Sequence, residues 1–222
     1  MTSKFKAAIF DLDGTLLDTL ADLANATNAV LTGRGYPAQP RNAYKAFVGG
    51  GARNLIVRAL TAIVGTAPAD DLVEAMLTDF KAEYGQNWNV QTRAYDGVAE
   101  LLADVDSLGL RSAILSNKPH EFTCLCAAAH FSPEQFDVIL GVNDATPPKP
   151  DLTGLNRLLA DWGVAPGEVV YLGDTGTDMK TARAAGCFAV GVTWGFRSRD
   201  ELVENGADAI IDHPRELAAL LR

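Results

Sequence analysis

Short apolar runs alternate with segments of helical periodicity along most of the chain. The β-forming runs occupy positions 5–10, 111–115, 138–140, 169–172, 188–192 and 209–211. Between them, apolar side chains recur every three or four residues at 98–108, 121–129, 152–162, 177–185 and 217–221. Gly109, Gly163 and Gly186 stand where such helices would end. Strands that alternate with helices in this way predict an α/β fold with a doubly wound, parallel, Rossmann-like sheet.

One long interval breaks this alternation. The stretch between the first apolar run and the second is too long for a single crossover connection. Its first part has helical periodicity and no convincing strand, at 20–31, 41–47, 52–63 and 70–84. The sequence therefore predicts a helical cap of residues 17–92, inserted into a catalytic α/β core of residues 1–16 and 93–222. The insertion leaves from the carboxyl end of the first strand, where ligands bind in open α/β sheets, so we expect it to act as a lid.

Two carboxylates follow the first apolar run directly, in the segment Asp11-Leu12-Asp13-Gly14-Thr15. Side chains alternate along a strand, so Asp11 and Asp13 are expected to begin on one face. Two buried like charges are costly unless a divalent cation or another group neutralises them. One carboxylate could then attack phosphorus while the other serves as general acid and base. The alternative is a strand end with two solvated acids.

A second acidic segment follows the fourth apolar run, where residues 173–178 are Gly-Asp-Thr-Gly-Thr-Asp. Magnesium prefers oxygen ligands and keeps several waters. One carboxylate here and one from the first strand could hold such an ion, which makes Asp174 and Asp178 candidate metal residues. The alternative is an ordinary turn in which Asp or Thr caps a helix.

Two further polar segments lie at predicted strand or crossover ends. Ser116, Asn117 and Lys118 follow the second run, where a hydroxyl and backbone amides could bind phosphate oxygens. Lys149, in a proline-rich loop at 147–150, could neutralise a phosphate and nearby acids. A serine that only caps a helix and a lysine at the surface are the alternatives. Because all these segments fall on the rim where such sheets bind ligands, together they favour phosphoryl transfer.

In this order, Asp11 to Thr15, Ser116, Lys149-Pro150 and residues 173–178 resemble the four motifs of the haloacid dehalogenase superfamily. The resemblance covers essentially the whole chain, and the inserted helices match the superfamily's cap after the first strand. It implies that Asp11 is the nucleophile and Asp13 the general acid and base. The presence of Asp13 and Thr15 favours a phosphatase over the dehalogenase branch, which lacks the second aspartate and needs no metal.

The resemblance also implies a metal site and a phosphate site. Mg²⁺ would be held by Asp11, the backbone carbonyl of Asp13 and Asp174, with Asp178 supporting them. The phosphoryl group would be bound by Ser116, Asn117 and Lys149. The superfamily's strand order places the first strand between the second and the fourth, so Ser116 and Asp174 would flank Asp11.

The resemblance extends to the substrate. Residues 116–119, 48–53 with 58–60, and 192–195 look most like phosphoglycolate phosphatases. In the cap, Gly50 could let backbone amides approach the substrate, and Arg53 could meet a carboxylate through two hydrogen bonds, although a solvated helix face is the alternative. We therefore expect a phosphoric monoester hydrolase acting on 2-phosphoglycolate. A sugar-phosphate mutase of the β-phosphoglucomutase type, a pyrophosphatase and a non-catalytic binding protein on the same fold are the rival functions.

Composition restricts the partners. Hydrophobic residues make up 48% of the 222 residues and charged residues 21%, which is enough to bury a core. The net charge of −9 argues against nucleic acid and anionic membranes as partners, although a bound cation still permits an anionic substrate. Three cysteines without CxxC spacing make a disulfide framework or a zinc site improbable and favour buried thiols.

Targeting signals are also missing from the sequence. No apolar run reaches 18 residues, and the N-terminus has no signal-peptide-like apolar region. We therefore expect a cytoplasmic enzyme, monomeric or homodimeric, that acts on a small phosphorylated metabolite.

Overall fold

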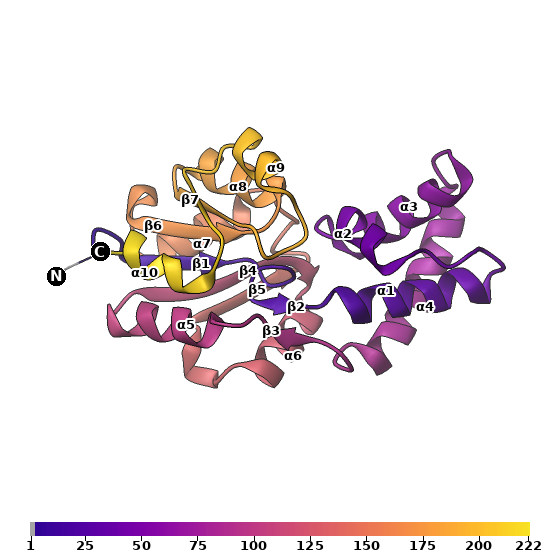
Figure 1. Cartoon of the computed structure of the whole chain (residues 1–222), viewed down its shortest axis with the longest axis horizontal. Coiled ribbons are helices and arrows are strands. Elements are labelled where there is room, and N and C mark those ends of the chain that lie inside the picture. The colour runs from indigo at the N-terminus through magenta and orange to yellow at the C-terminus, as the bar shows by residue number, and fades with distance from the viewer. Residues whose placement is uncertain (1–2) are drawn as a thin grey trace. The chain divides into compact units, whose positions relative to one another are not determined.

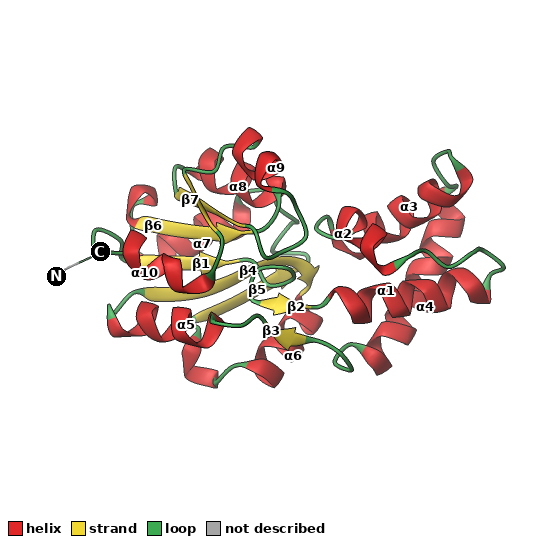
Figure 2. Cartoon of the chain, in the orientation of Figure 1, coloured by secondary structure: helices red, strands yellow, loops and turns green. Residues whose placement is uncertain are grey.

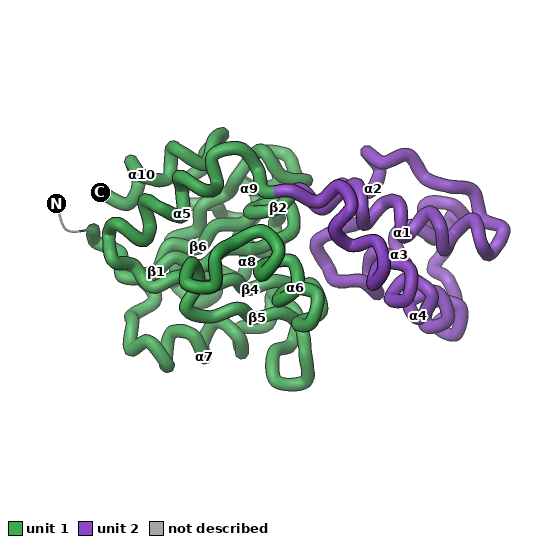
Figure 3. Tube along the Cα trace, turned by 90° about the horizontal axis from the view of Figure 1, so that it is seen from below, with its two compact units in different colours: residues 1–17, 94–222 green, residues 18–93 purple. Residues whose placement is uncertain are grey.

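The computed structural model describes residues 3–222 and divides the chain into two compact units (Figure 3). One unit consists of the chain up to Leu17 together with Ala94–Arg222, and the other of Asp18–Arg93. In Figures 1 and 2 the first contains a sheet with helices on both faces, whereas the second is helical.

A six-stranded sheet forms the centre of the first unit, in the order β5-β4-β1-β6-β7-β8. Its strands are β1 (Ala7–Phe10), β4 (Arg111–Pro119), β5 (Val138–Val142), β6 (Val169–Gly173), β7 (Phe188–Val192) and β8 (Ala209–Ile211). All neighbouring strands pair in parallel. The predicted doubly wound α/β fold is therefore confirmed, and β1 lies between β4 and β6 as the resemblance implied.

Six α-helices accompany this sheet within the described residues. They are α5 (Val98–Ser107), α6 (His120–His130), α7 (Thr153–Trp162), α8 (Gly176–Ala185), α9 (Arg199–Glu204) and α10 (Leu217–Leu220). Helix α9 is absent from the elements expected from sequence, because its residues are mostly charged and only Leu202 is buried, so no apolar face marks it. Its start is marked by Ser198, whose side chain accepts a hydrogen bond from the backbone N–H of Glu201.

The sheet is buried on both faces at its centre. Ala7 and Ile9 of β1 belong to a core cluster with residues of α7 and α8. Phe10 points to the other face, where its ring packs edge-on against Phe136 with centroids 6.3 Å apart. A strand covered on both faces has a continuous apolar sequence, as β1 does. A carboxylate at the end of such a strand therefore follows directly after residues that are buried away from solvent.

The second unit consists of helices α1 (Leu20–Gly33), α2 (Tyr44–Phe47), α3 (Gly51–Val64) and α4 (Asp70–Asn87). Helix α1 packs against α4, and α3 packs against both α2 and α4. Two very short strands, β2 (Leu17–Asp18) and β3 (Arg93–Ala94), pair where the chain passes from one unit to the other. Neither was expected from sequence, because two residues have no measurable alternation.

A buried carboxylate ties together the two ends of the helical unit. Asp22 in α1 accepts hydrogen bonds from the backbone N–H groups of Val90, Gln91 and Thr92. A carboxylate can be buried at low cost when several N–H groups satisfy it. Asp22 therefore anchors the segment that leads back to the sheet.

The state of the cysteines and the presence of membrane-spanning helices can both be examined in the structure. Cys126 and Cys187 are buried and Cys124 is half-buried, and none of the three forms a disulfide within residues 3–222. Among residues 3–222, no helix combines the length and the apolar character that crossing a bilayer requires.

Candidate active site

Three buried carboxylates meet at the carboxyl end of the sheet. One oxygen each from Asp11, Asp174 and Asp178 lies within 4.8 Å of the others. Strands β1 and β6 pair in parallel and in register, and the N–H of Asp11 continues the ladder by donating to the carbonyl of Leu172 at 2.9 Å. Acids that are far apart in sequence therefore emerge side by side from neighbouring strands.

The start of helix α8 holds Asp178 in place. Thr175 caps the helix, and its side-chain oxygen accepts a hydrogen bond from the N–H of Asp178. In return, the Asp178 carboxylate accepts from the Thr175 N–H at 3.1 Å and from its hydroxyl at 2.6 Å. This is a capping box. Thr175 therefore caps the helix, and the same hydrogen bonds orient Asp178 within the carboxylate cluster, whose role as a metal site stays a prediction.

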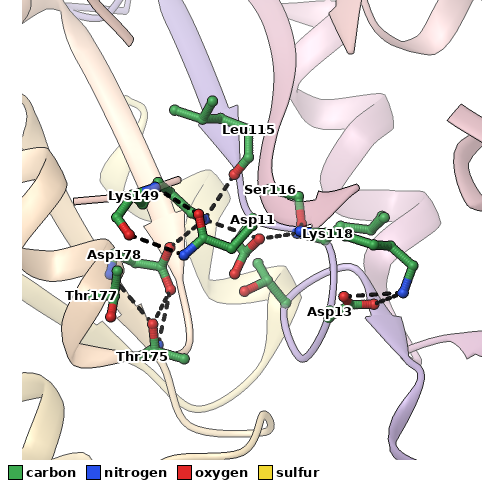
Figure 4. A network of polar contacts seen from close by, with 12 residues as sticks. Asp11, Asp13, Leu115, Ser116, Lys118, Lys149, Thr175, Thr177 and Asp178 are labelled. Carbon is green, nitrogen blue, oxygen red and sulfur yellow. Dashed lines mark hydrogen bonds and ion pairs between the residues drawn. The ribbon is translucent and has the colours of Figure 1, made fainter. Parts of the chain in front are cut away.

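Lys149 lies against two of these acids (Figure 4). Its ammonium group is 3.0 Å from Asp11 Oδ1 and 2.7 Å from Asp178 Oδ1, and it donates to the carbonyl of Leu115 at 2.8 Å. Burial opposes the charge of this lysine, but Asp11 and Asp178 outweigh it and hold its pKa well above the usual value. Lys149 is therefore a permanent cation beside the expected nucleophile.

One lysine does not balance the cluster. Burial raises the pKa of Asp11 to about 7, against the opposing effect of Lys149 and with further contributions from Asp178 and Asp13. Burial, followed by the charges of Asp11 and Asp178, raises the pKa of Asp174 well above its usual value. In the absence of a metal ion the carboxyl groups of Asp11 and Asp174 favour protons, because burial and, to a smaller extent, neighbouring acids penalise their charged forms.

Asp13 has a different environment from Asp11. Strand β1 ends at Phe10, and the backbone then turns so that the N–H groups of Leu16 and Leu17 both donate to the carbonyl of Leu12. The expectation that Asp11 and Asp13 begin on one face stays a prediction, and the charge of Asp13 contributes to the raised pKa of Asp11. The carboxylate of Asp13 meets Lys118, and its roles as general acid and base and as carbonyl ligand stay predictions.

Ser116 and Asn117 lie in the last part of β4 and are buried. The hydroxyl oxygen of Ser116 accepts from the N–H of Lys118 at 3.3 Å. The side-chain amide of Asn117 donates to the Lys149 carbonyl at 3.1 Å and accepts from the Lys149 N–H at 2.6 Å. The Asn117 side chain therefore positions the loop of Lys149, and phosphate binding by Ser116 and Asn117 stays a prediction.

A loop after β7 supports the site from another side. The N–H of Phe196 donates to Asp174 Oδ2 at 2.8 Å, and the Trp194 indole donates to the Thr15 carbonyl at 2.9 Å. Gly195 lies so close that a Cβ there would collide with Asp174 and with the Gly14 carbonyl. The sequence associated residues 192–195 only with the substrate resemblance, and no local signal reveals that they position Asp174.

Gly195→Ala is expected to displace Asp174. The added methyl group has no room, because its neighbours are a buried side chain and a backbone carbonyl. If Asp174 holds Mg²⁺ as the resemblance implies, displacing its carboxylate by a fraction of an ångström should raise the Mg²⁺ concentration for half-maximal activity about 10-fold and lower kcat about 10²-fold. Titrating Mg²⁺ in a phosphate-release assay measures both.

Gly167→Ala is the matched control, because nothing lies within 4 Å of a Cβ at that position. It should match the wild type in both quantities. A Gly195→Ala variant with wild-type Mg²⁺ dependence would show that the loop does not hold a metal ligand.

The two substrate residues expected from sequence in the helical unit are Gly50 and Arg53. Gly50 precedes α3, and its carbonyl accepts from the side-chain amide of Asn54 at 2.7 Å. Arg53 pairs with Asp70 at 2.5 Å and with Glu74 at 3.0 Å, and it is exposed. The structure thus places Arg53 on a solvated helix face, engaged with α4, and contact of either residue with a substrate stays a prediction.

Comparison with known proteins identifies the family. The model of the haloacid dehalogenase-like hydrolases matches residues 8–192. The chain belongs to this family. The resemblance seen in the sequence is thereby confirmed, as is the prediction that the chain is a hydrolase. The match includes every acid of the carboxylate cluster and both lysines of the site.

Individual relatives cover nearly the whole chain. A phosphoglycolate phosphatase of Thiobacillus denitrificans is 31% identical over 97% of this chain and 95% of its own length. An N-acetylmuramic acid 6-phosphate phosphatase of Pseudomonas aeruginosa is 33% identical over 98% of this chain and 95% of its own length. A crystal structure from Lactobacillus delbrueckii subsp. bulgaricus, provisionally described as a phosphoglycolate phosphatase, superposes with a TM-score of 0.93 at 31% identity and covers 98% of both chains.

Proposed function

We propose that this protein is a magnesium-dependent phosphatase that hydrolyses a small phosphate monoester through an aspartyl-phosphate on Asp11. The observation that carries the proposal is the buried cluster of Asp11, Asp174 and Asp178 with Lys149 beside it. A nucleophile, an acidic metal site and a cation at one rim of the sheet are what phosphoryl transfer requires. Membership of the hydrolase family and the phosphatase relatives support it.

The residues of the site fit a magnesium ion. Three carboxylates within 4.8 Å of one another supply the hard oxygen ligands that Mg²⁺ prefers. The oxygens of Asp178 already accept from Lys149, Tyr171 and Thr175. We therefore propose that Asp11 and Asp174 hold the ion, joined by the Asp13 carbonyl, while Asp178 supports them. When bound, the ion neutralises the cluster and draws charge from the phosphoryl oxygens.

The residues then carry out two successive displacements. In the first, a carboxylate oxygen of Asp11 attacks phosphorus, the bond to the ester oxygen breaks, and the leaving alcohol takes a proton from the carboxyl group of Asp13. In the second, Asp13 takes a proton from water as the water oxygen attacks phosphorus. The bond to Asp11 breaks, inorganic phosphate leaves, and both aspartates return to their starting forms. Lys149 offsets negative charge at Asp11 and at the transferring group throughout.

We propose that the helical unit, Asp18–Arg93, is the cap that selects the substrate. It is inserted immediately after the segment that carries Asp11 and Asp13. Gly50 and Arg53 stay its candidate substrate residues. A carboxylate substrate would have to compete with Asp70 and Glu74 for the Arg53 guanidinium.

The first candidate substrate is 2-phosphoglycolate, and N-acetylmuramic acid 6-phosphate is the second. Relatives at 31% and 33% identity bear these two substrate names. Both molecules combine a phosphate monoester with a carboxylate, so the same two kinds of recognition would serve either of them.

A panel of phosphate esters tests the proposal. Phosphate release is expected from p-nitrophenyl phosphate and from one of the two candidate substrates in the presence of Mg²⁺, and it should stop when EDTA is added. The preferred candidate substrate should have a kcat/KM at least about 10-fold higher than that of p-nitrophenyl phosphate. The reason is that its carboxylate and other binding groups add to transition-state stabilisation.

The same panel separates the rival functions. A mutase would convert β-glucose 1-phosphate only when primed with a bisphosphate, and a pyrophosphatase would prefer pyrophosphate. If no ester is hydrolysed with Mg²⁺, the proposal is wrong. A non-catalytic binding protein on the same fold is then the remaining candidate function.

A further inference from the structure

We propose that Lys118 is a positioning residue that holds the carboxylate of Asp13 in place for its proton transfers. This inference rests on the proposed function, because it assigns a task to a neighbour of the general acid and base. The ammonium group of Lys118 lies 2.9 Å from one carboxylate oxygen of Asp13 and 3.1 Å from the other (Figure 4). No feature of the sequence singled out this contact, which joins residues 105 positions apart.

The backbone around Lys118 is held on both sides. Its N–H donates to the hydroxyl of Ser116 at 3.3 Å, and its carbonyl accepts from the hydroxyl of Thr123 at 3.2 Å. A Cβ at Gly141 of the neighbouring strand would collide with the same carbonyl. The lysine therefore extends toward Asp13 from a rigid part of the sheet.

The two lysines of the site serve different acids. Lys149 contacts Asp11 and Asp178, which belong to the carboxylate cluster, whereas Lys118 contacts Asp13. Asp13 stands on the turn after β1, outside the cluster. A carboxylate on a turn gains a fixed orientation when one donor engages both of its oxygens, and proton transfer depends on such orientation.

The exposures of the two partners indicate what removal of the lysine would do. The Lys118 side chain is 3% exposed, and that of Asp13 is 13% exposed. Without its partner, Asp13 can turn toward solvent more readily than a fully buried carboxylate could. Loss of Lys118 should therefore release the carboxylate from its working position while the fold persists.

Lys118→Met, which removes the charge and keeps the length of the side chain, is the principal test, with p-nitrophenyl phosphate as the substrate. The nitrophenolate departs without needing a proton, so only the attack of water depends on Asp13. We expect kcat to fall about 10- to 100-fold, KM to stay the same or fall, and the aspartyl-phosphate to accumulate. Mass spectrometry of acid-quenched protein measures the phosphorylated fraction.

Lys6→Met is the matched control, because Lys6 forms an exposed ion pair with Glu168 and has no contact with the acids of the site. It should leave kcat and the phosphorylated fraction unchanged. A Lys118→Met variant with wild-type kcat would overturn the inference. A raised KM at unchanged kcat would also overturn it, since that result assigns Lys118 to substrate binding.

A second comparison tests the route through Asp13. In an Asp13→Asn background no charged partner is left behind, so the double variant should fold even if Lys118→Met alone does not. If Lys118 acts through Asp13, adding Lys118→Met to Asp13→Asn should change turnover less than about twofold. A further large loss would overturn the inference.

Failure of the proposed function gives a different result. In that case the wild type forms no aspartyl-phosphate with any ester in the panel. If the wild type is phosphorylated but the Lys118 variants turn over normally, only the role of Lys118 is refuted.

Discussion

Replacing Asp11 with asparagine is expected to lower kcat for phosphate release by about 10⁴-fold or more. The amide nitrogen of asparagine has no lone pair available for attack, and its carbonyl oxygen is a far weaker nucleophile than a carboxylate. No aspartyl-phosphate should form in the acid-quenched protein. The assay uses p-nitrophenyl phosphate with saturating Mg²⁺.

The stability of the metal-free Asp11→Asn variant should not fall together with its activity. Because burial raises the pKa of Asp11 to about 7, the metal-free folded state holds a proton that the unfolded state has lost. Between the unfolded value of 3.8 and about 7, stability therefore falls as pH rises, and the full cost of the charge is present at pH 8. Without metal at pH 8, Asp11→Asn should melt no lower than the wild type.

Magnesium separates this effect from a general stabilisation. The ion should raise the Tm of the wild type and raise that of Asp11→Asn much less, since a ligand is missing. Asp161→Asn is the matched control, because Asp161 forms an exposed pair with Arg157 on a helix surface. If Asp11→Asn retained more than about 1% of wild-type turnover, Asp11 would not be the nucleophile.

Replacing Lys149 with methionine should have the second-largest effect. Its ammonium group contacts Asp11 and Asp178, and its side chain is 3% exposed. Breaking a buried ion pair from one side costs about 3–5 kcal/mol, because the remaining charges lose their compensation. The metal-free variant should therefore lose that much unfolding free energy at pH 8, and its kcat should fall about 10³-fold.

Added Mg²⁺ should restore part of the stability that Lys149→Met loses. With the lysine gone, the ion is the main compensation for the cluster, so the Mg²⁺-induced gain should exceed that of the wild type. Urea unfolding with EDTA and with Mg²⁺ measures both gains, and Lys6→Met controls for loss of an exposed lysine. Equal losses with and without the ion would show that the ion does not take over the compensating role of Lys149 in this cluster.

The sequence predicted the parts of the fold whose signal is local. Residues 7–10 are an uninterrupted apolar run because β1 is covered on both faces. Helix α9 and the strands β2 and β3 escaped prediction, because α9 buries only Leu202 among mostly charged residues and the two strands have two residues each. Boundaries of the longer helices differ from the expected ones by a few residues, as capping turns are part of the helix ends.

The residues of the candidate site could be named from the sequence, but their partners could not. Asp11, Asp174 and Lys149 follow strand ends, and strand ends of a parallel sheet share one rim. The side chain of Asn117 holds the Lys149 loop across 32 positions of sequence, a contact that the sequence does not reveal, and the phosphate contact of Asn117 stays a prediction. Phe196 and Gly195 position Asp174 from a loop that has no chemical signal of its own.

By itself, the sequence determined the class of the fold, the inserted helical segment and the acids and lysines available for chemistry, because periodicity and side-chain type are properties of neighbouring residues. Only the tertiary structure decided that Lys149 pairs with Asp11 and Asp178 while Lys118 pairs with Asp13. The physical reason is that ion pairs act over a few ångströms, and those distances are set by strand register and loop packing between segments far apart in the chain.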